Sequence, residues 1–255
     1  MSTQQIQLTV LGSATPYPSI DNPCSGYLIS AHSTRVWMDA GTGTLGPLQQ
    51  HVKLEDLDAI WISHLHADHS ADLLTAFYAL VFGDVHRPAP LPLFGPPGIA
   101  ERLANYLTNG QTRAPIASAF EVHELYDGHE TQVGNLTLTT RAVSHGIPAF
   151  SVRVSTPSAS LVFSGDTAPC ANLIELAADC DALLCESEST SAPENEAQVH
   201  HTPEDAGRTA AVARAGRLII THVGRSLSPE EATRRAATKY QGRIEFASPG
   251  TTFTI

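Results

Sequence analysis

The stretch from Trp61 to His69 reads Trp-Ile-Ser-His-Leu-His-Ala-Asp-His, and it places three imidazoles and one carboxylate within six positions. An apolar run at 57–62 leads into it, and a helix-like run at 69–81 follows it. Residues two apart share a face of an extended segment, so His64 and His66 can point at one metal ion. Asp68 and His69 fall at the turn into the helix and suit a second ion. Imidazole and carboxylate are ligands that Zn²⁺, Mn²⁺ and Fe accept.

The whole chain sets broad limits on the protein. Its 255 residues suffice for one domain over residues 1–255 with a sizeable core. The sequence shows neither a signal-peptide pattern nor an apolar run of the ~18–20 residues that a membrane helix needs. The four scattered cysteines form no CxxC pair, which indicates free thiols and a cytoplasmic protein. A net charge of −11 argues against a broad, sequence-independent surface for nucleic acid.

Apolar runs and turn residues predict an α+β chain. Strands are expected at residues 6–11, 27–30, 35–39, 59–62, 91–94, 120–125, 136–142, 150–155, 161–163, 182–185, 218–221 and 244–246. Helices are expected from residue 44 to about 50 and at 69–81, 97–107, 172–178, 203–213 and 229–239. The polar stretch 187–199 has no periodicity and is expected to be a loop. The 69–81 helix is apolar on more than one face, which leaves open burial by the core alone or also by a partner subunit; a homodimer is our prediction.

Three more polar residues follow predicted strands, each next to a small residue or turn signal. His145 lies in Val-Ser-His-Gly, Asp166 in Ser-Gly-Asp-Thr and His222 in Thr-His-Val-Gly. A single histidine at a strand end is more often structural than ligating. Three such residues in addition to the 64–69 stretch provide seven ligands, which suffice for two ions if one carboxylate bridges them.

With these residues the chain resembles the metallo-β-lactamase superfamily. It matches the HxHxDH motif of that superfamily and the later His, Asp and His, and the resemblance covers nearly the whole chain. The resemblance implies a four-layer αββα sandwich and a dinuclear zinc site. By that match, His64, His66 and His145 hold one ion, Asp68, His69 and His222 hold the other, and Asp166 bridges them. Asp39, in Asp-Ala-Gly-Thr-Gly, matches an acidic strand end that supports the site. The lactamases usually have Cys where Asp166 stands, so a β-lactam substrate is disfavoured.

Within the superfamily the chain looks most like the tRNase Z and phosphodiesterase branch. The supporting stretches are 11–16, 41–44, 164–170 and 200–203. The branch implies a proton-transferring histidine near the start of the last stretch, which is His200, with His201 as the rival. Of the branch's His-Glu-Ala, only Glu186 is kept, and we expect it to hold His200. Only 20 residues separate His145 from Asp166, too few for the arm that often grips tRNA, and this argues against tRNA processing.

The expected function is therefore a hydrolase with two divalent ions, zinc being favoured over manganese or iron. Two ions that share a hydroxide could attack phosphorus, with Asp68 orienting the nucleophile and His200 protonating the leaving oxygen. The favoured substrate is a small anionic phosphodiester, such as a cyclic nucleotide; an RNA 3′ end ranks lower. Alternatives are a lactonase or thioesterase on the same ions and a metal-binding module without activity. No membrane partner is expected.

Overall fold

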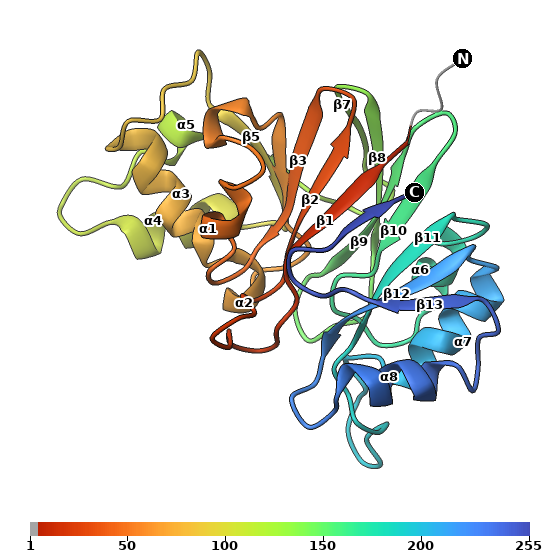
Figure 1. The fold of residues 1–255 in the computed structure, drawn as a ribbon. Coiled ribbons are helices and arrows are strands. Elements are labelled where there is room, and N and C mark those ends of the chain that lie inside the picture. The colour runs from red at the N-terminus through yellow and green to blue at the C-terminus, as the bar shows by residue number, and fades with distance from the viewer. Residues whose placement is uncertain (1–4) are drawn as a thin grey trace.

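The computed structural model describes residues 5–255, and its centre is a pair of seven-stranded sheets that pack face to face (Figure 1). The first sheet has the spatial order β14 (Thr252–Thr254), β1 (Gln7–Gly12), β2 (Gly26–Ala31), β3 (Thr34–Ala40), β4 (Ala59–Trp61), β5 (Leu91–Gly95) and β6 (Phe120–Glu124). The strands β14 to β3 pair antiparallel, whereas β3 to β6 run parallel.

The second sheet has the same mixed design. Its spatial order is β13 (Arg243–Phe246), β12 (Arg217–Val223), β11 (Ala182–Ser187), β10 (Ser160–Phe163), β9 (Phe150–Ser155), β8 (Leu136–Ala142) and β7 (Glu130–Val133). The strands β7 to β10 pair antiparallel, and β10 to β13 run parallel. Parallel neighbours need crossover connections, and the helices supply them.

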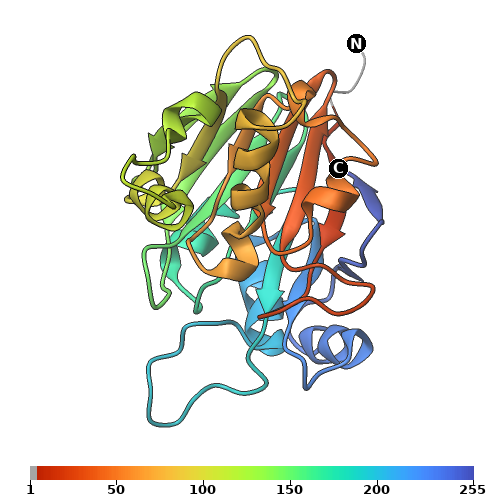
Figure 2. The same ribbon diagram turned by 90° about the vertical axis from the view of Figure 1, so that its left-hand side faces the viewer.

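Helices cover the outer face of each sheet (Figures 1 and 2). On the first sheet lie α1 (Leu45–Leu48), the 3-10 turn η1 (Leu54–Asp56), α2 (Ala67–Ser70), α3 (Asp72–Val81), α4 (Ile99–Leu107) and α5 (Ile116–Ala119). On the second lie α6 (Ala171–Leu176), α7 (Pro203–Ala213) and α8 (Pro229–Ala236). Among the described residues, no helix has the length and apolar character of a membrane span.

Three buried clusters correspond to the three interfaces between these layers. The inner faces of both sheets share one cluster, in which the ring of Phe163 packs against Tyr27 and Trp61. A second cluster lies between the first sheet and its helices, and a third lies between the second sheet and α6–α8. Each sheet buries both of its faces, as parallel strands require. The predicted αββα sandwich is confirmed.

The structure differs from the predicted elements in a few places. The predicted 69–81 helix is two helices, α2 and α3, separated by Ala71, whose backbone angles are still helical. The helix predicted from Pro97 begins at Ile99, since Gly98 adopts a left-handed conformation (φ 85°) just before it. Strands β7 and β14 and helix α5 were not predicted, because each is short and neither strand contains an apolar run. The 187–199 loop begins one residue later, as Ser187 ends β11.

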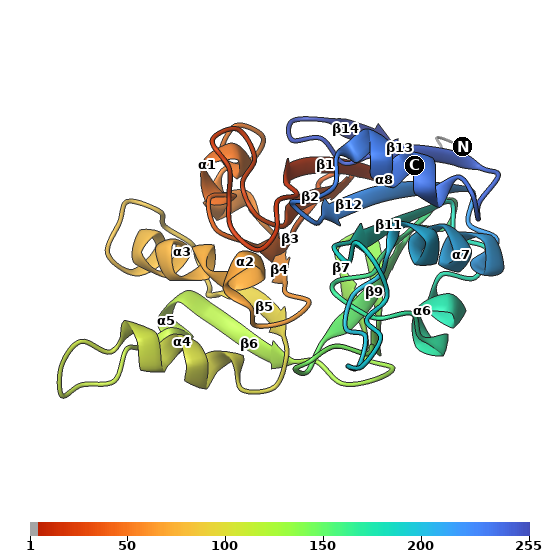
Figure 3. The ribbon, with the colours of Figure 1, turned by 90° about the horizontal axis from the view of Figure 1, so that it is seen from below.

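The topology positions the site. The parallel strands β3, β4, β10, β11 and β12 all end at the same edge of the sandwich, which is the lower end in Figure 1 and faces the viewer in Figure 3. Helix α2 and the 188–199 loop lie at this end too (Figures 1 and 3). Ligand sites in sheets of this kind form at the carboxyl ends of parallel strands.

Candidate metal centre

Three histidines converge on one point at this edge. His64 Nε2 lies 3.0 Å from His66 Nδ1, and His145 Nε2 lies 3.3 Å from the same His66 nitrogen. A single N–H on His66 Nδ1 would have to serve both neighbours, because His64 and His145 donate through Nδ1 to Ser63 and Val199. The arrangement is that of three ligands around a cation, and with Asp166 it forms a group with donor atoms within 4.8 Å of one another.

A second group lies beside the first and is more deeply buried. His69 Nε2 is 3.0 Å from His222 Nε2, and Asp68 Oδ2 is 3.3 Å from His222 Nε2 and 3.7 Å from His69 Nε2. All three residues are buried. Two imidazoles and one carboxylate again present a compact set of borderline-hard donors.

Asp166 lies between the two groups. Its Oδ2 is 3.6 Å from His64 Nε2 in the first group and 3.3 Å from His69 Nε2 in the second. Its Oδ1 is 3.6 Å from His222 Nδ1. The structure therefore brings together all seven residues that the sequence analysis names as ligands, and it puts Asp166 where a shared ligand would stand. Their assignment as ligands remains a prediction.

A buried carboxylate behind the site orients both groups. Asp39 Oδ2 accepts hydrogen bonds from His69 Nδ1, at 2.6 Å, and from the Ser63 hydroxyl, at 2.8 Å, while Oδ1 accepts from the Ser63 backbone N–H. Because its hydroxyl hydrogen is used on Asp39, Ser63 Oγ can accept from His64 Nδ1, 3.1 Å away. Both imidazoles then carry their proton on Nδ1 and present a free Nε2 to the cluster, as metal-bound histidines require. His145 is fixed in the same way by the carbonyl oxygen of Val199, 3.0 Å from its Nδ1.

The backbone is strained where this support is made. Asp39 (φ 56°) and His222 (φ 49°) both adopt the left-handed conformation that glycine prefers. Both are buried. Such strain of about 1–3 kcal/mol persists only where surrounding contacts enforce it, and it concentrates at functional sites.

His200 lies at the rim of the second group between two carboxylates. Its Nδ1 is 2.9 Å from Glu186 Oε1 and its Nε2 is 2.9 Å from Glu188 Oε2. Burial lowers the pKa of this imidazole, but the two glutamates outweigh it and raise the pKa to about 11. The rival His201 is fully buried and bonds to the Thr167 carbonyl and the Thr209 hydroxyl, so it does not face the cluster.

Sequence reasoning missed Glu188. It forms a third group of possible ligands with Asp166, His200 and His222, and its Oε2 lies 3.8 Å from His222 Nδ1. The signal was its position two residues after Glu186, which puts both side chains on the same side of an extended chain. Contacts with His200 and His222 lower the pKa of its carboxyl despite burial.

The donor set fits divalent ions. Asp166 Oδ1 and His222 Nδ1 are buried and have no hydrogen-bond partner among the described residues. Buried polar atoms are otherwise nearly always paired, so these two point to a bound group. Burial, and then the neighbouring His69, push the pKa of His64 well below its usual value, whereas the carboxylates of Asp166 and Asp39 outweigh burial and raise the pKa of His69; a bound cation would displace the extra proton from His69.

Comparison with known proteins agrees with this geometry. Residues 34–223 match the family described as the beta-lactamase superfamily domain. The chain belongs to this superfamily. It is 34% identical over 256 residues to an uncharacterized protein of Mycobacterium leprae, covering 98% of the chain and 89% of that protein. It is also 32% identical over 273 residues to a protein of Mycobacterium bovis named Ribonuclease Z, covering 94% of the chain and 95% of the relative.

Solved structures of superfamily members share the fold. The metallo-β-lactamase fold protein YhfI of Bacillus subtilis matches with a TM-score of 0.86 at 23% identity, covering 99% of this chain and 100% of that one. The short form of human tRNase Z matches with a TM-score of 0.77 at 20% identity, covering 97% and 98%. Yeast PDE1 matches with a TM-score of 0.72 at 13% identity, covering 99% and 100%. This superfamily chain thus has a metallo-hydrolase fold that implies divalent metal ions, and it has clusters of His and Asp residues that could hold them.

Proposed function

We propose that this superfamily member is a phosphodiesterase that hydrolyses small anionic phosphodiesters at a dinuclear metal centre, with zinc as the favoured metal. The observation that carries the proposal is Asp166, which stands between two adjacent ligand groups and within 3.9 Å of His200. Bound divalent ions would supply Lewis acidity and an activated water of pKa ~7. His64, His66 and His145 would hold one ion, Asp68, His69 and His222 the other, and Asp166 both.

The charge of this site favours an anionic substrate. Two divalent cations exceed the charge of Asp68 and Asp166 by two, and an activated hydroxide would reduce that excess to one. At the rim, a cationic His200 between the carboxylates of Glu186 and Glu188 adds one negative charge, so the positive charge is confined to the ions. A phosphodiester monoanion would be attracted to the ions themselves, and the charge that grows in its transition state would be stabilised there. A neutral ester or lactone would gain less on arrival, which is why acyl hydrolysis is not our proposal.

The chain's own acids and bases would handle the protons. Asp68, a buried member of the second group, would orient the attacking water. His200 would donate the proton on Nε2 to the leaving oxygen, while Glu186 holds Nδ1 and fixes the ring. Glu188, 2.9 Å from Nε2, would hold this proton until the leaving oxygen replaces the carboxylate as its acceptor.

The experiment that tests the proposal combines metal analysis with substrates of different bond types. Purified protein supplemented with zinc should contain two ions per chain and hydrolyse bis(p-nitrophenyl) phosphate faster than a thioester or a lactone. The His200→Ala variant should retain both ions and lose about 10²–10⁴-fold in turnover, the usual contribution of a general acid. A matched control is His123→Ala, since this half-exposed histidine pairs with Glu121 outside the site.

Three outcomes would overturn the proposal. Fewer than two ions per chain would remove the dinuclear centre. Faster cleavage of acyl substrates than of phosphodiesters would show that the protein is an acyl hydrolase and not a phosphodiesterase. Loss of metal in His200→Ala would make His200 structural. The Asp166→Ala variant provides a further check, because a shared ligand has no substitute and its loss should abolish dinuclear binding.

RNA 3′-end processing is a second candidate, supported by the relative named Ribonuclease Z. Against it stand the net charge of −11 and the connection from His145 to Asp166, which is occupied by the hairpin of β9 and β10. Cleavage of a precursor tRNA at a rate matching bis(p-nitrophenyl) phosphate would favour this candidate. A homodimer and a cytoplasmic location remain part of the proposal.

A further inference from the structure

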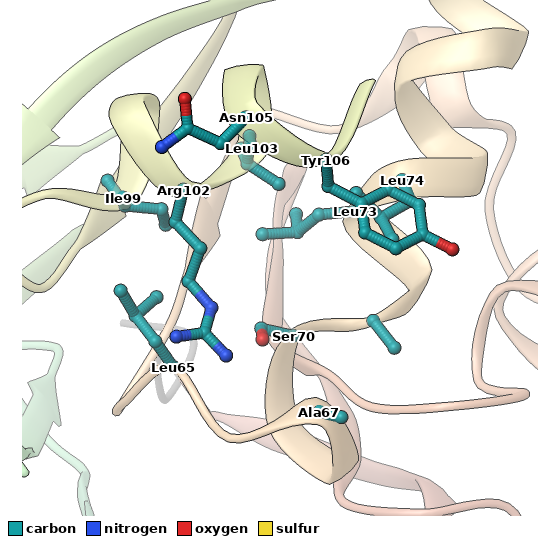
Figure 4. Close-up of a pocket in the computed structure, with 11 residues that line it drawn as sticks. Leu65, Ala67, Ser70, Leu73, Leu74, Ile99, Arg102, Leu103, Asn105 and Tyr106 are labelled. Atoms are coloured by element: carbon teal, nitrogen blue, oxygen red, sulfur yellow. The ribbon is translucent and has the colours of Figure 1, made fainter. Parts of the chain in front are cut away.

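A groove of about 570 Å³ lies on the outer helical layer of the first sheet, between α2–α3 and α4 (Figure 4). Cavities of about 300–1,000 Å³ are the range that small organic ligands occupy. Its wall is largely apolar, and its polar side chains are few. The apolar lining residues are Leu65, Ala67, Ala71, Leu73, Leu74, Ile99, Leu103 and Tyr106.

One cation serves this groove. Arg102 extends from α4 across the groove toward Leu65 and Ser70 (Figure 4). Its guanidinium has no ion pair with any of the residues that the structure describes, and no lining residue carries a carboxylate. A guanidinium with free donors above an apolar floor is complementary to a carboxylate or phosphate on an apolar body. Asn105 adds a neutral polar group to the lining.

Exposed side chains distinguish the groove from an ordinary gap between helices. Arg102 is exposed, and Tyr106 is 70% exposed at the rim. A ligand that covers an apolar groove gains about 25 cal/mol of binding free energy for each Å² of apolar surface that it removes from water.

The groove adjoins the metal centre but does not share its ligands. Leu65 and Ala67, which line it, flank His66 in the chain, and Ser70 donates a hydrogen bond of 2.8 Å to the His66 carbonyl. The seven candidate ligands themselves are absent from its lining. Binding in the groove can therefore be measured without metal in the centre.

We propose that this groove binds an amphiphilic organic anion, that is, a molecule with an apolar body and one carboxylate or phosphate paired with Arg102. The apolar body lies on the leucines of α3 and α4. The site is separate from the dinuclear centre and does not depend on the phosphodiesterase activity, but it requires that the homodimer proposed above leave Leu73 and Leu74 uncovered.

A tryptophan reporter tests the proposal. The Tyr106→Trp variant places an indole on the groove rim, whereas the two native tryptophans, Trp37 and Trp61, are buried. The control is Val212→Trp, because Val212 is 55% exposed on α7 in the opposite layer. Each protein is treated with EDTA and titrated with octanoate, octyl phosphate, octanol and octyltrimethylammonium.

The expected result is a saturable blue shift of the reporter, with the control unchanged. Both octyl anions should bind about two- to fivefold more tightly than octanol, the range that an exposed ion pair provides, and the cation should bind most weakly. Adding Arg102→Met, which keeps the apolar stem, should abolish this preference for anions. Adding the equivalent change Arg234→Met on α8 should leave it intact.

Several results would overturn the proposal. One is no shift at millimolar octanoate, and another is an equal shift in the control. Equal affinity for octanol and octanoate would remove the role of Arg102. A reporter emission that is already blue and depends on protein concentration would show that a second copy of the chain covers the groove.

Discussion

Replacing Asp39 by Asn removes one charge from behind the site and changes few atoms. The carboxylate accepts three hydrogen bonds, two from Ser63 and one from His69. The amide of asparagine has one acceptor oxygen and one donor NH₂ group. Its NH₂ group must therefore face at least one of the Ser63 and His69 groups that donate to the carboxylate in the wild type. A buried donor without a partner costs about 1–3 kcal/mol, and the least costly response is for His69 to move its proton to Nε2. That nitrogen is the one that faces His222 and Asp166.

The expected effect on metal binding is therefore larger than the small change in volume suggests. Losing the partner of a metal-bound histidine usually weakens metal affinity by about 10–100-fold. Competition with a chelator of known zinc affinity would measure this for the second ion. Asp58→Asn is the matched control, because the exposed Asp58 accepts a backbone hydrogen bond from Arg35 far from the site. The reasoning is refuted if Asp39→Asn binds both ions as tightly as the wild type, or if Asp58→Asn weakens binding equally.

Three further predictions concern backbone packing, metal and thiols. Gly41→Ala should lower the melting temperature and the zinc affinity together, because a Cβ at residue 41 would lie 2.0 Å from the Asp68 carbonyl oxygen. The control is Gly46→Ala on α1, where a Cβ meets nothing within 4 Å. This control should leave the melting temperature unchanged or raise it slightly. EDTA should lower the melting temperature relative to that of the zinc-loaded protein, because a ligand at 100 times its Kd stabilises the folded state by about 2.7 kcal/mol per site. Equal melting temperatures with EDTA and with zinc would contradict metal binding. Burial raises the pKa of the Cys24 thiol to about 12, so at pH 8 only about one molecule in 10⁴ carries this thiolate. A disulfide reagent should therefore modify the partly exposed Cys170 before the buried Cys24. Rapid modification of more than one thiol in the folded protein would contradict this order.

The sequence predicted the site better than it predicted the support around it. His64, His66, Asp68 and His69 are neighbours in the chain, so their spacing alone suggests a shared target. His145, Asp166 and His222 could be found because each follows a predicted strand, an alternating one before His145 and apolar ones before Asp166 and His222. In contrast, the spacing of Glu186 and Glu188 puts both carboxylates on one side of the chain, but their contact with His200 depends on the conformation of the 188–199 loop, whose sequence shows no periodicity.

The fold was predictable to a similar degree. Long alternating or apolar runs such as those of β8 and β12 could be predicted as strands. Their arrangement in two sheets came from the resemblance to the metallo-β-lactamase superfamily. The short strands β7 and β14 form because a partner strand is already in place, so their own residues carry little signal. The groove beside α4 depends on how far apart two helices pack, which is a property of the assembled layer and not of either helix.

The left-handed backbone at Asp39 and His222 has a consequence for anyone who wishes to make this protein more heat-resistant. Glycine would relieve strain of about 1–3 kcal/mol at either position, but it would also remove the three hydrogen bonds of Asp39 or the buried ring of His222. The loss exceeds the gain, so the usual exchange of a left-handed residue for glycine should lower the melting temperature here. These two codons are therefore best held fixed in a library aimed at thermal stability.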